Sequence, residues 1–463
     1  MKARKLILSI FAVGACAATF STTTYAWFRM NSRAQVSNLS FKVISGLGFK
    51  IAVDASNSAY FTDTLTTDQM EAAIVRGYNP DKYVFYQNKL YEYVPIEELK
   101  PTAEDPNHKE VVSHRYIELS KTDIQNILSN IKLDLATTMV NDSEGHTTSD
   151  GYSLYNEFGE AITDRNKYLE FSLYFKTDSD LVSDNQHFGI YISDDTTYVK
   201  DGQKDKDGNP IEVPMNPTSI KSAIQQIKLV NDMSYLNKDY EMVNLSAGDF
   251  VSMSLNNAIR FSTRDLGVVK VTPKETGTID YTIPDEGKEE TPKTPENEET
   301  TETTTADIVV EGNVITSNTK LVEDEEINDG GVNTAAKIYE LSDENNLGSY
   351  ITNYDGDENE EKRMYGANYS AMYSYYNSLG AASDEVKPLN YNDLKEMYEA
   401  GKIVNDLDPE NILTVVDSGL DAHKITFRFW LEGFDSDYFA GVSGLVPISC
   451  NLSFKVNSKY GRN

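Results

Sequence analysis

Apolar and polar side chains alternate with a period of two in several separate stretches of the chain, and this pattern limits the fold more than any other feature. The alternation is clearest at 169–175, 425–431 and 448–456, where large aliphatic or aromatic residues take every second position. Since successive side chains of a strand point to opposite faces, each stretch buries one face and leaves the other to solvent or to a covering element. The pattern predicts a mainly β protein, built as an antiparallel β-sandwich.

Shorter stretches add strands to this sandwich. Alternation at 39–43 and again at 49–53, separated by a Ser-Gly-Leu-Gly sequence, predicts a β-hairpin. Further strands are predicted at 188–192, 259–261, 268–271 and 308–310.

Helical patterns are short and fall in the connections between strands. Capping boxes at 66–69 and 122–125 each precede an apolar stripe, and apolar residues at helical spacing also occur at 220–227 and 394–398. These helices do not alternate regularly with the strands, so a doubly wound parallel sheet is disfavoured.

The amino terminus has the pattern of an export signal. A basic start is followed by 23 residues without a formal charge, from Leu6 to Phe28, and Thr24 and Ala26 place small residues where a signal peptidase reads them. A basic start, a short apolar stretch and small residues at the cleavage site are typical of a secretory signal peptide. We therefore expect residues 1–26 to be a signal peptide, cleaved after Ala26, and the protein to be secreted.

Two alternatives remain open for this segment. It is long enough for a retained anchor, because about 20 apolar residues span a bilayer, although the hydroxyl-rich stretch 19–25 makes a poor membrane helix. The sequence before Cys16 loosely matches a lipoprotein box, although Gly14 fits it weakly and the residues after Cys16 stay apolar. Once the segment is removed, Cys450 is the single cysteine, and the alternation around it predicts a small core residue.

Acidity excludes two classes of partner. Lys plus Arg total 42 and Asp plus Glu total 73, which gives a formal net charge of −31. A general nucleic-acid binder needs a basic face for phosphate contacts, and docking on anionic lipid also needs positive charge. We expect no nucleic-acid partner, and contact with a membrane only through an uncleaved amino-terminal segment.

One internal segment differs in composition from the rest. Residues 284–306 are rich in Thr, Glu and Pro and contain no Leu, Ile, Val or Phe. Such a segment buries too little apolar area to fold, so we expect a disordered loop. Because the cost of closing a loop grows only slowly with its length, the chain from 27 to 463 is expected to form a single β-sandwich domain with insertions.

The two ends of the chain resemble a known family. The run from Thr24 to Phe28, followed by 36–43, is similar to the start of the TasA and camelysin-type surface proteins of Gram-positive bacteria, which carry a SipW-type signal. The carboxyl-terminal ends of such proteins are similar to the stretch 425–435 and the last strand of this chain. Arg29 stands where the family commonly has Asp, and the middle of the chain is not matched.

The resemblance implies a jelly-roll-like β-sandwich, secretion, and assembly into surface fibres or a biofilm matrix. In the fibre-forming members the freed amino-terminal segment adds as a strand to the next subunit. Here that segment runs from 29 to 43, with Leu39, Phe41 and Val43 as its apolar side chains. The alternative is that 36–43 pairs inside its own chain, because the gain from burying three side chains nearly cancels the cost of ordering the strand.

No pattern of a catalytic or metal site stands out. The histidines form neither an HExxH motif nor a pair at helical spacing; they lie at 108, 114, 146, 187 and 423. The Asp-rich stretch 201–209 resembles a calcium loop, but Gln203 and Pro214 stand where ligands are needed, so a polar turn is the favoured interpretation. We expect no enzyme and no cofactor, with calcium as a weak alternative.

Aromatic residues give one further candidate surface. Tyr365, Tyr369, Tyr373 and Tyr376 recur at helical spacing. They form either an aromatic contact surface for a sugar or protein, or a helix packed on the sandwich. Trp430 lies on the face opposite Phe427 and Phe429 and is covered by a helix or sits in an assembly surface.

The sequence therefore predicts a structural protein of the cell surface or extracellular matrix that contacts itself or other surface proteins. Two alternatives are a monomeric surface adhesin that binds carbohydrate, and a lipid-anchored surface lipoprotein.

Overall fold

The computed structural model describes the backbone of these residues: 33–36, 40–45, 49–103, 105–156, 159–177, 187–193, 197–204, 206–214, 217–222, 225–228, 233–236, 242–253, 258–271, 308–317, 327–328, 336–340, 391–404, 412–417, 421–433, 444–446 and 448–457. The predicted loop at 284–306 lies outside these ranges.

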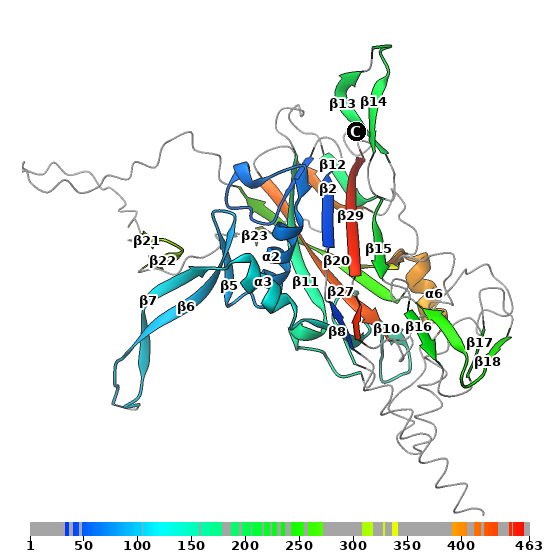
Figure 1. Ribbon diagram of the computed structural model, residues 1–463, viewed down its shortest axis with the longest axis horizontal. Helices are drawn as coiled ribbons and strands as arrows, with labels where there is room; N and C mark the ends of the chain where they lie inside the picture. Colours follow the sequence, from blue (N-terminus) through cyan, green and yellow to red (C-terminus); the bar gives the residue numbers. More distant parts are fainter. Residues whose placement is uncertain are drawn as a thin grey trace, which may run out of the picture.

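The described chain is mainly β, and the class predicted from the alternation is confirmed (Figure 1). The largest sheet contains β1 (Arg33–Val36), β3 (Phe49–Ala52), β8 (Lys132–Ala136), β11 (Leu169–Thr177), β20 (Ile259–Lys270), β23 (Ile327–Asn328), β24 (Lys337–Glu340), β25 (Ile403–Val404), β27 (Asp421–Glu432) and β28 (Gly444–Val446). A second sheet contains β2 (Ser40–Ser45), β4 (Thr64–Leu65), β12 (His187–Ile192), β15 (Ser219–Ser222), β26 (Ile412–Asp417) and β29 (Ile448–Asn457).

Smaller sheets extend from this body. A third sheet contains β5 (Tyr83–Tyr86), β6 (Lys89–Leu99), β7 (Lys109–Glu118), β21 (Ile308–Glu311) and β22 (Val314–Ser317). The two-stranded sheets are β9 (Val140–Asn141) with β10 (Thr147–Thr148), β13 (Thr197–Lys204) with β14 (Pro210–Pro214), β16 (Gln225–Lys228) with β19 (Phe250–Met253), and β17 (Met233–Leu236) with β18 (Met242–Leu245). The long β6–β7 hairpin projects away from the body (Figure 1).

Helices are few in the described ranges. They are α2 (Thr67–Tyr78), α3 (Lys121–Leu128) and α6 (Tyr391–Glu399), with two 3-10 turns, η1 (Ser58–Tyr60) and η2 (Arg165–Lys167). Thr66 caps α2 through the predicted capping box. The second box starts two residues earlier than predicted, at Ser120, whose hydroxyl accepts from the Asp123 amide while the Asp123 carboxylate accepts from the Ser120 amide. No helix in the described part of the chain is long and apolar enough to cross a membrane.

The two large sheets pack face to face through aromatic side chains. The Phe175 and Phe427 rings of the ten-stranded sheet lie 5.0 and 5.8 Å from the Phe454 ring of the six-stranded sheet, measured between centroids. All three side chains are fully buried in one continuous apolar cluster. The packing is sandwich-like, as predicted, whereas the jelly-roll connectivity stays a prediction.

Two sequence-based elements were wrong. The stretches 39–43 and 49–53 do not form a hairpin, because β2 pairs with β29 in one sheet and β3 with β11 in the other. The alternation of side chains within a strand is the same whether the next strand forms a hairpin in the same sheet or crosses to the other sheet. It therefore does not distinguish a hairpin from a crossover. The predicted helix at 220–227 is instead β15 and β16, because β29 offers an edge to which β15 pairs, with Ile220 beside Cys450.

α6 covers the outer side of the ten-stranded sheet. Trp430 is fully buried with Leu394 and Met397 of α6, which agrees with the helix-covered alternative. The indole N–H of Trp430 donates to the buried Glu432 carboxylate at 3.0 Å. Beneath α6 the buried Arg260 lies 3.1 Å from Glu340, measured from Nη2 to Oε1. The buried Arg260 guanidinium and the Glu432 carboxylate therefore each have a partner within the fold.

The Arg260–Glu340 ion pair generates a first prediction. Replacing Glu340 by Leu leaves a buried guanidinium without this partner and is expected to lower the free energy of unfolding by about 3–5 kcal/mol. Replacing both residues, Arg260→Met with Glu340→Leu, is expected to cost less than the sum of the single changes. Denaturant unfolding measures each. The control is Lys121→Met, which removes an exposed pair with Asp68 and should leave stability almost unchanged. A Glu340→Leu effect no larger than that of the control contradicts this account.

The thiol of Cys450 generates a second prediction. Cys450 is 1% exposed, as the inward position predicted, and burial raises the pKa of its thiol well above the ordinary value. Because the thiolate is the reactive form, a disulfide reagent at neutral pH should not label Cys450 in the folded protein, and should label it at once in denaturant. Rapid labelling under native conditions contradicts the packing described for β29.

Candidate functional site

The amino-terminal strands lie in both large sheets. β2 runs parallel to β29 over six residues, from Ser40 beside Ser449 to Ser45 beside Phe454. On its other side β2 pairs with the two residues of β4. β1 lies between β8 and β28 in the ten-stranded sheet. The segment 33–45 therefore adds one strand to each layer of the sandwich, and β2 lies beside β29 in Figure 1.

This placement bears on the predicted donor segment. Phe41 and Val43 belong to β2, where their register partners are Cys450 and Leu452. Leu39 lies outside the described residues. In the structure the strand pairs within its own chain, and its donation to another copy stays a prediction. We call the position of β2 between β29 and β4 the strand slot.

Several predicted residues lie outside the described ranges and are placed nowhere in the structure. They are Cys16, Ala26, Tyr365, Tyr369, Tyr373 and Tyr376.

Among the described residues, the histidines and acids do not gather into a metal site. No group of three His, Cys, Asp or Glu side chains is close enough to hold a metal ion within the part of the chain that the structure describes. His114 stacks on Tyr93 at 5.8 Å, and His423 lies 2.9 Å from the Thr414 hydroxyl. In the Asp-rich stretch 201–209, Asp207 is exposed in the turn that joins β13 to β14.

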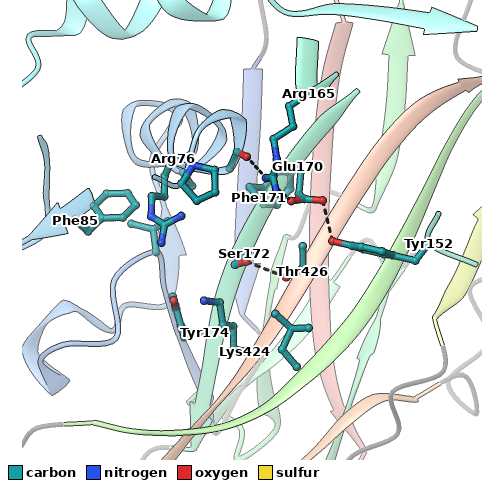
Figure 2. Close-up of a pocket in the computed structure, with 15 residues that line it drawn as sticks. Arg76, Phe85, Tyr152, Arg165, Glu170, Phe171, Ser172, Tyr174, Lys424 and Thr426 are labelled. Carbon is teal, nitrogen blue, oxygen red and sulfur yellow. Dashed lines mark hydrogen bonds and ion pairs between the residues drawn. The ribbon is translucent and has the colours of Figure 1, made fainter. Parts of the chain in front are cut away.

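A pocket lies between α2 and the outer side of the ten-stranded sheet, and the sequence analysis missed it. We call it the α2 pocket (Figure 2). Its volume is about 170 Å³. It is lined by Val53, Ala73, Arg76, Gly77, Pro80, Phe85, Tyr152, Arg165, Glu170, Phe171, Ser172, Tyr174, Leu266, Lys424 and Thr426.

The carboxylate of Glu170 is the acid of this pocket, and its oxygens accept several hydrogen bonds. Oε1 accepts from Arg165 Nη1 at 2.9 Å. Oε2 accepts from the Tyr152 hydroxyl at 2.8 Å and from Arg428 Nε at 2.8 Å. Two guanidinium groups thus balance one carboxylate, and the Arg428 guanidinium also stacks over the Tyr152 ring at 3.6 Å. Burial and the Glu170 charge raise the pKa of the Tyr152 phenol, so this group stays protonated and donates.

Two further cations enter the pocket from different elements. Arg76 comes from α2 and Lys424 from β27, and both side chains are half-buried (Figure 2). The Lys424 ammonium lies 5.4 Å from the centre of the Tyr174 ring. The hydroxyls of Ser172 and Thr426 lie 2.9 Å apart on the floor formed by β11 and β27. The pocket therefore combines positive charge, hydroxyl groups and aromatic walls.

The strand register brings these groups together. Glu170, Ser172 and Tyr174 alternate along β11, and their direct cross-strand neighbours on β27 are Arg428, Thr426 and Lys424. The sequence shows that both strands have a polar outward face, which was the available signal. It does not show which two strands are neighbours, because 254 residues separate Ser172 from Thr426.

Gly77 sets how closely α2 lies on the sheet. A Cβ atom at this position would come within 1.8 Å of the Glu170 carbonyl oxygen. The Gly77 carbonyl in turn accepts from Arg165 Nη1 at 2.6 Å. The end of the helix therefore rests on the backbone of β11, and the pocket forms beside this contact.

Comparison of the chain with protein-family models, with curated proteins and with solved structures finds no match.

The Gly77 contact generates a third prediction. Gly77→Ala forces the helix end away from β11 and is expected to lower the free energy of unfolding by roughly 3 kcal/mol, because a packed backbone relaxes poorly. The control is Gly312→Ala, which has a positive φ of 61° but nothing within 4 Å of the added Cβ. That change is expected to cost only the backbone strain, roughly 1–2 kcal/mol. Equal effects of the two substitutions in denaturant unfolding contradict the close contact.

Proposed function

We propose that the chain is an exported structural protein of the cell surface or extracellular matrix, and that copies assemble by exchanging the amino-terminal strand. The observation that carries the proposal is the pairing of segment 33–45 with both layers of the sandwich, beside β28 and β29 near the other end of the chain. A segment with this placement completes both sheets through main-chain hydrogen bonds. The same segment from a second copy fits the same positions.

The energetics favour exchange over a new interface. A donated β2 forms the same ladder with β29 that it forms within its own chain, so the contact energy is nearly unchanged. The balance between the two states then depends on protein concentration and on the link between β2 and β3. That link is the sequence Gly46-Leu47-Gly48, which extends to roughly 10 Å at most. Donor and acceptor therefore pack closely, as in a fibre.

Exposed apolar strands also support assembly by contact. Ile308, Val309 and Val310 of β21 are 38%, 52% and 55% exposed, and β21 ends the order of the five-stranded sheet. An exposed strand of β-branched residues at the end of a sheet is a template for pairing with another chain. Within the described residues, this is a second surface through which copies can meet.

The alternative of a monomeric surface adhesin is favoured by one observation, the α2 pocket with its cations and aromatic walls. The two functions differ in oligomeric state, since an adhesin needs no exchange of strands.

A disulfide experiment generates the fourth prediction. Lys42 and Asn451 are register partners in β2 and β29. Paired strands are about 4.8 Å apart, within the Cα range of a disulfide. One preparation of residues 27–463 carries Lys42→Cys and another carries Asn451→Cys, both with Cys450→Ala. Mixed and left to assemble, they are expected to give a disulfide between chains, seen by non-reducing electrophoresis, because each strand is donated to another copy.

The matched control places Lys42→Cys and Asn451→Cys in one chain. In a dilute sample kept monomeric, this variant is expected to form the disulfide within the chain, which shows that the two positions can react. If the double variant forms its disulfide while the mixed single variants stay uncrosslinked in the assembled protein, strand exchange is wrong.

Amino-terminal sequencing of the exported protein tests the predicted secretion and signal cleavage. The mature chain is expected to start at Trp27.

A further inference from the structure

The exposed apolar side chains gather on the five-stranded sheet. Among the residues that the structure describes, seven large apolar side chains are exposed, and six of them belong to this sheet. Three lie on the β6–β7 hairpin, and the other three are consecutive in β21. β21 lies at the opposite end of the sheet from β5, which contacts α2 (Figure 1).

The hairpin and β21 differ in how they are protected against pairing with another strand. The hairpin carries cross-strand ion pairs, with Lys100 Nζ 3.0 Å from Glu110 Oε2 and Lys109 Nζ 3.6 Å from Glu97 Oε2. Charged side chains of this kind discourage association between sheet edges. β21 has the sequence Ile-Val-Val-Glu, without Lys or Pro, and its one partner among the described strands is β22. Its outer edge is therefore open to a further strand.

The register of the sheet shows what a further strand would cover. Val310 lies beside Ile315 of β22, and Ile315 lies beside Tyr116 of β7. Ile315 and Tyr116 are buried, whereas Val310, at the end of the same row, is 55% exposed. A strand added to β21 would extend this row by one side chain and cover Val310 from its open side.

β21 is complementary to itself. Residues that lie opposite each other in an antiparallel pair share one face of the sheet. A two-fold axis through Val309, perpendicular to the sheet, therefore places Val309 opposite its own counterpart and Ile308 opposite the counterpart of Val310. All three β-branched side chains then meet β-branched side chains, which suit cross-strand pairs. Glu311 lies outside these three pairs.

The sequence of β21 favours a second copy over a partner of another kind. The strand has no cationic side chain that would select an acidic segment. A second copy supplies the matching strand at the concentration of the protein itself. The net charge of −31 opposes the approach of two copies, so we expect the contact to be weak at low ionic strength.

We propose that β21 pairs antiparallel with β21 of a second copy about a two-fold axis through Val309, so that two five-stranded sheets become one continuous sheet. The paired edge is four residues long in each copy and buries far less than the roughly 1,200 Å² of a stable interface, so it forms a weak dimer. The proposal specifies the partner of the exposed β21 strand. It does not rest on strand exchange, because it uses a different surface.

Sedimentation equilibrium of a chain that cannot exchange its amino-terminal strand tests the proposal. Residues 27–463 with Lys42→Cys, Asn451→Cys and Cys450→Ala, with the disulfide closed within the chain, hold β2 beside β29 and leave β21 unchanged. We call this protein the locked chain. It is expected to dimerise with a dissociation constant on the order of 0.1 mM, and added salt should strengthen the dimer by screening the repulsion between acidic copies.

Charges introduced at the axis test the register. Val309→Lys in the locked chain places two like charges directly opposite each other and is expected to weaken the dimer at least about tenfold, and Val309→Glu should do the same. An equal mixture of these two variants should restore the dimer to within about threefold of the locked chain, since opposite charges then meet. The matched control is Val111→Lys, an exposed apolar position of the same sheet outside β21, which should leave the dimer unchanged.

A disulfide between copies tests the same register independently. Val309→Cys with Cys450→Ala, in the chain with Lys42 and Asn451 unchanged, places one thiol of each copy at the axis. Opposite Cα atoms of an antiparallel pair are about 4.5–5.5 Å apart, within the range of a disulfide. Mild oxidation is expected to give a linked dimer, whereas the control Val111→Cys with Cys450→Ala should stay monomeric.

The outcomes separate this contact from its rivals. A locked chain that stays monomeric at several times the expected dissociation constant overturns the proposal, as does a dimer that Val309→Lys and Val111→Lys weaken equally. If the mixture of Val309→Lys and Val309→Glu stays monomeric, the two-fold register is wrong. A β21 dimer that persists in the locked chain supports the proposal even where the strand-exchange experiment fails, so the two can fail separately.

Discussion

The alternation of side chains along β27 is the constraint on which the rest of the structure depends. Both long edges of this strand are paired, to β20 and to β11, and both of its faces are covered. Phe427 and Phe429 lie in the core between the sheets. On the other face, Thr426 contacts Ser172, Arg428 donates to Glu170, and Trp430 packs with α6. A shift of one residue in its register would exchange these faces, placing charge in the core and aromatic rings on the other face. The register of β27 therefore determines the packing of the sandwich, the position of the pocket and the position of α6.

The local parts of the fold were predictable from the sequence, because they depend on neighbours a few residues apart. The alternation located β11, β27 and β29, and the capping box of Thr66 located α2. Which strands pair was not predictable, since alternation carries no information about partners. This is why the hairpin over 39–53 was wrong and why 220–227 was assigned to a helix. The α2 pocket was missed for the same reason, because its floor depends on the pairing of β11 with β27 across a long sequence separation.

Two kinds of contact emerge from this architecture. The strand slot is formed by backbone pairing of β2 with β29 and β4, and backbone pairing of this kind is what a second copy of the chain would have to reproduce under the proposed exchange. The α2 pocket is lined by side chains, among them Arg76, Lys424 and Glu170. The slot is formed by β4 and β29, and the pocket is formed by residues between 53 and 174 together with Leu266 and β27.

The most direct measurement of the central claim is a density map of the assembled protein at a resolution that traces the backbone. The account predicts that the strand beside β29 connects, through Gly46–Gly48, to β3 of the neighbouring subunit, so that each sandwich is completed by another copy. A map in which that strand connects to β3 of the same chain, in fibres held together by other surfaces, would contradict it.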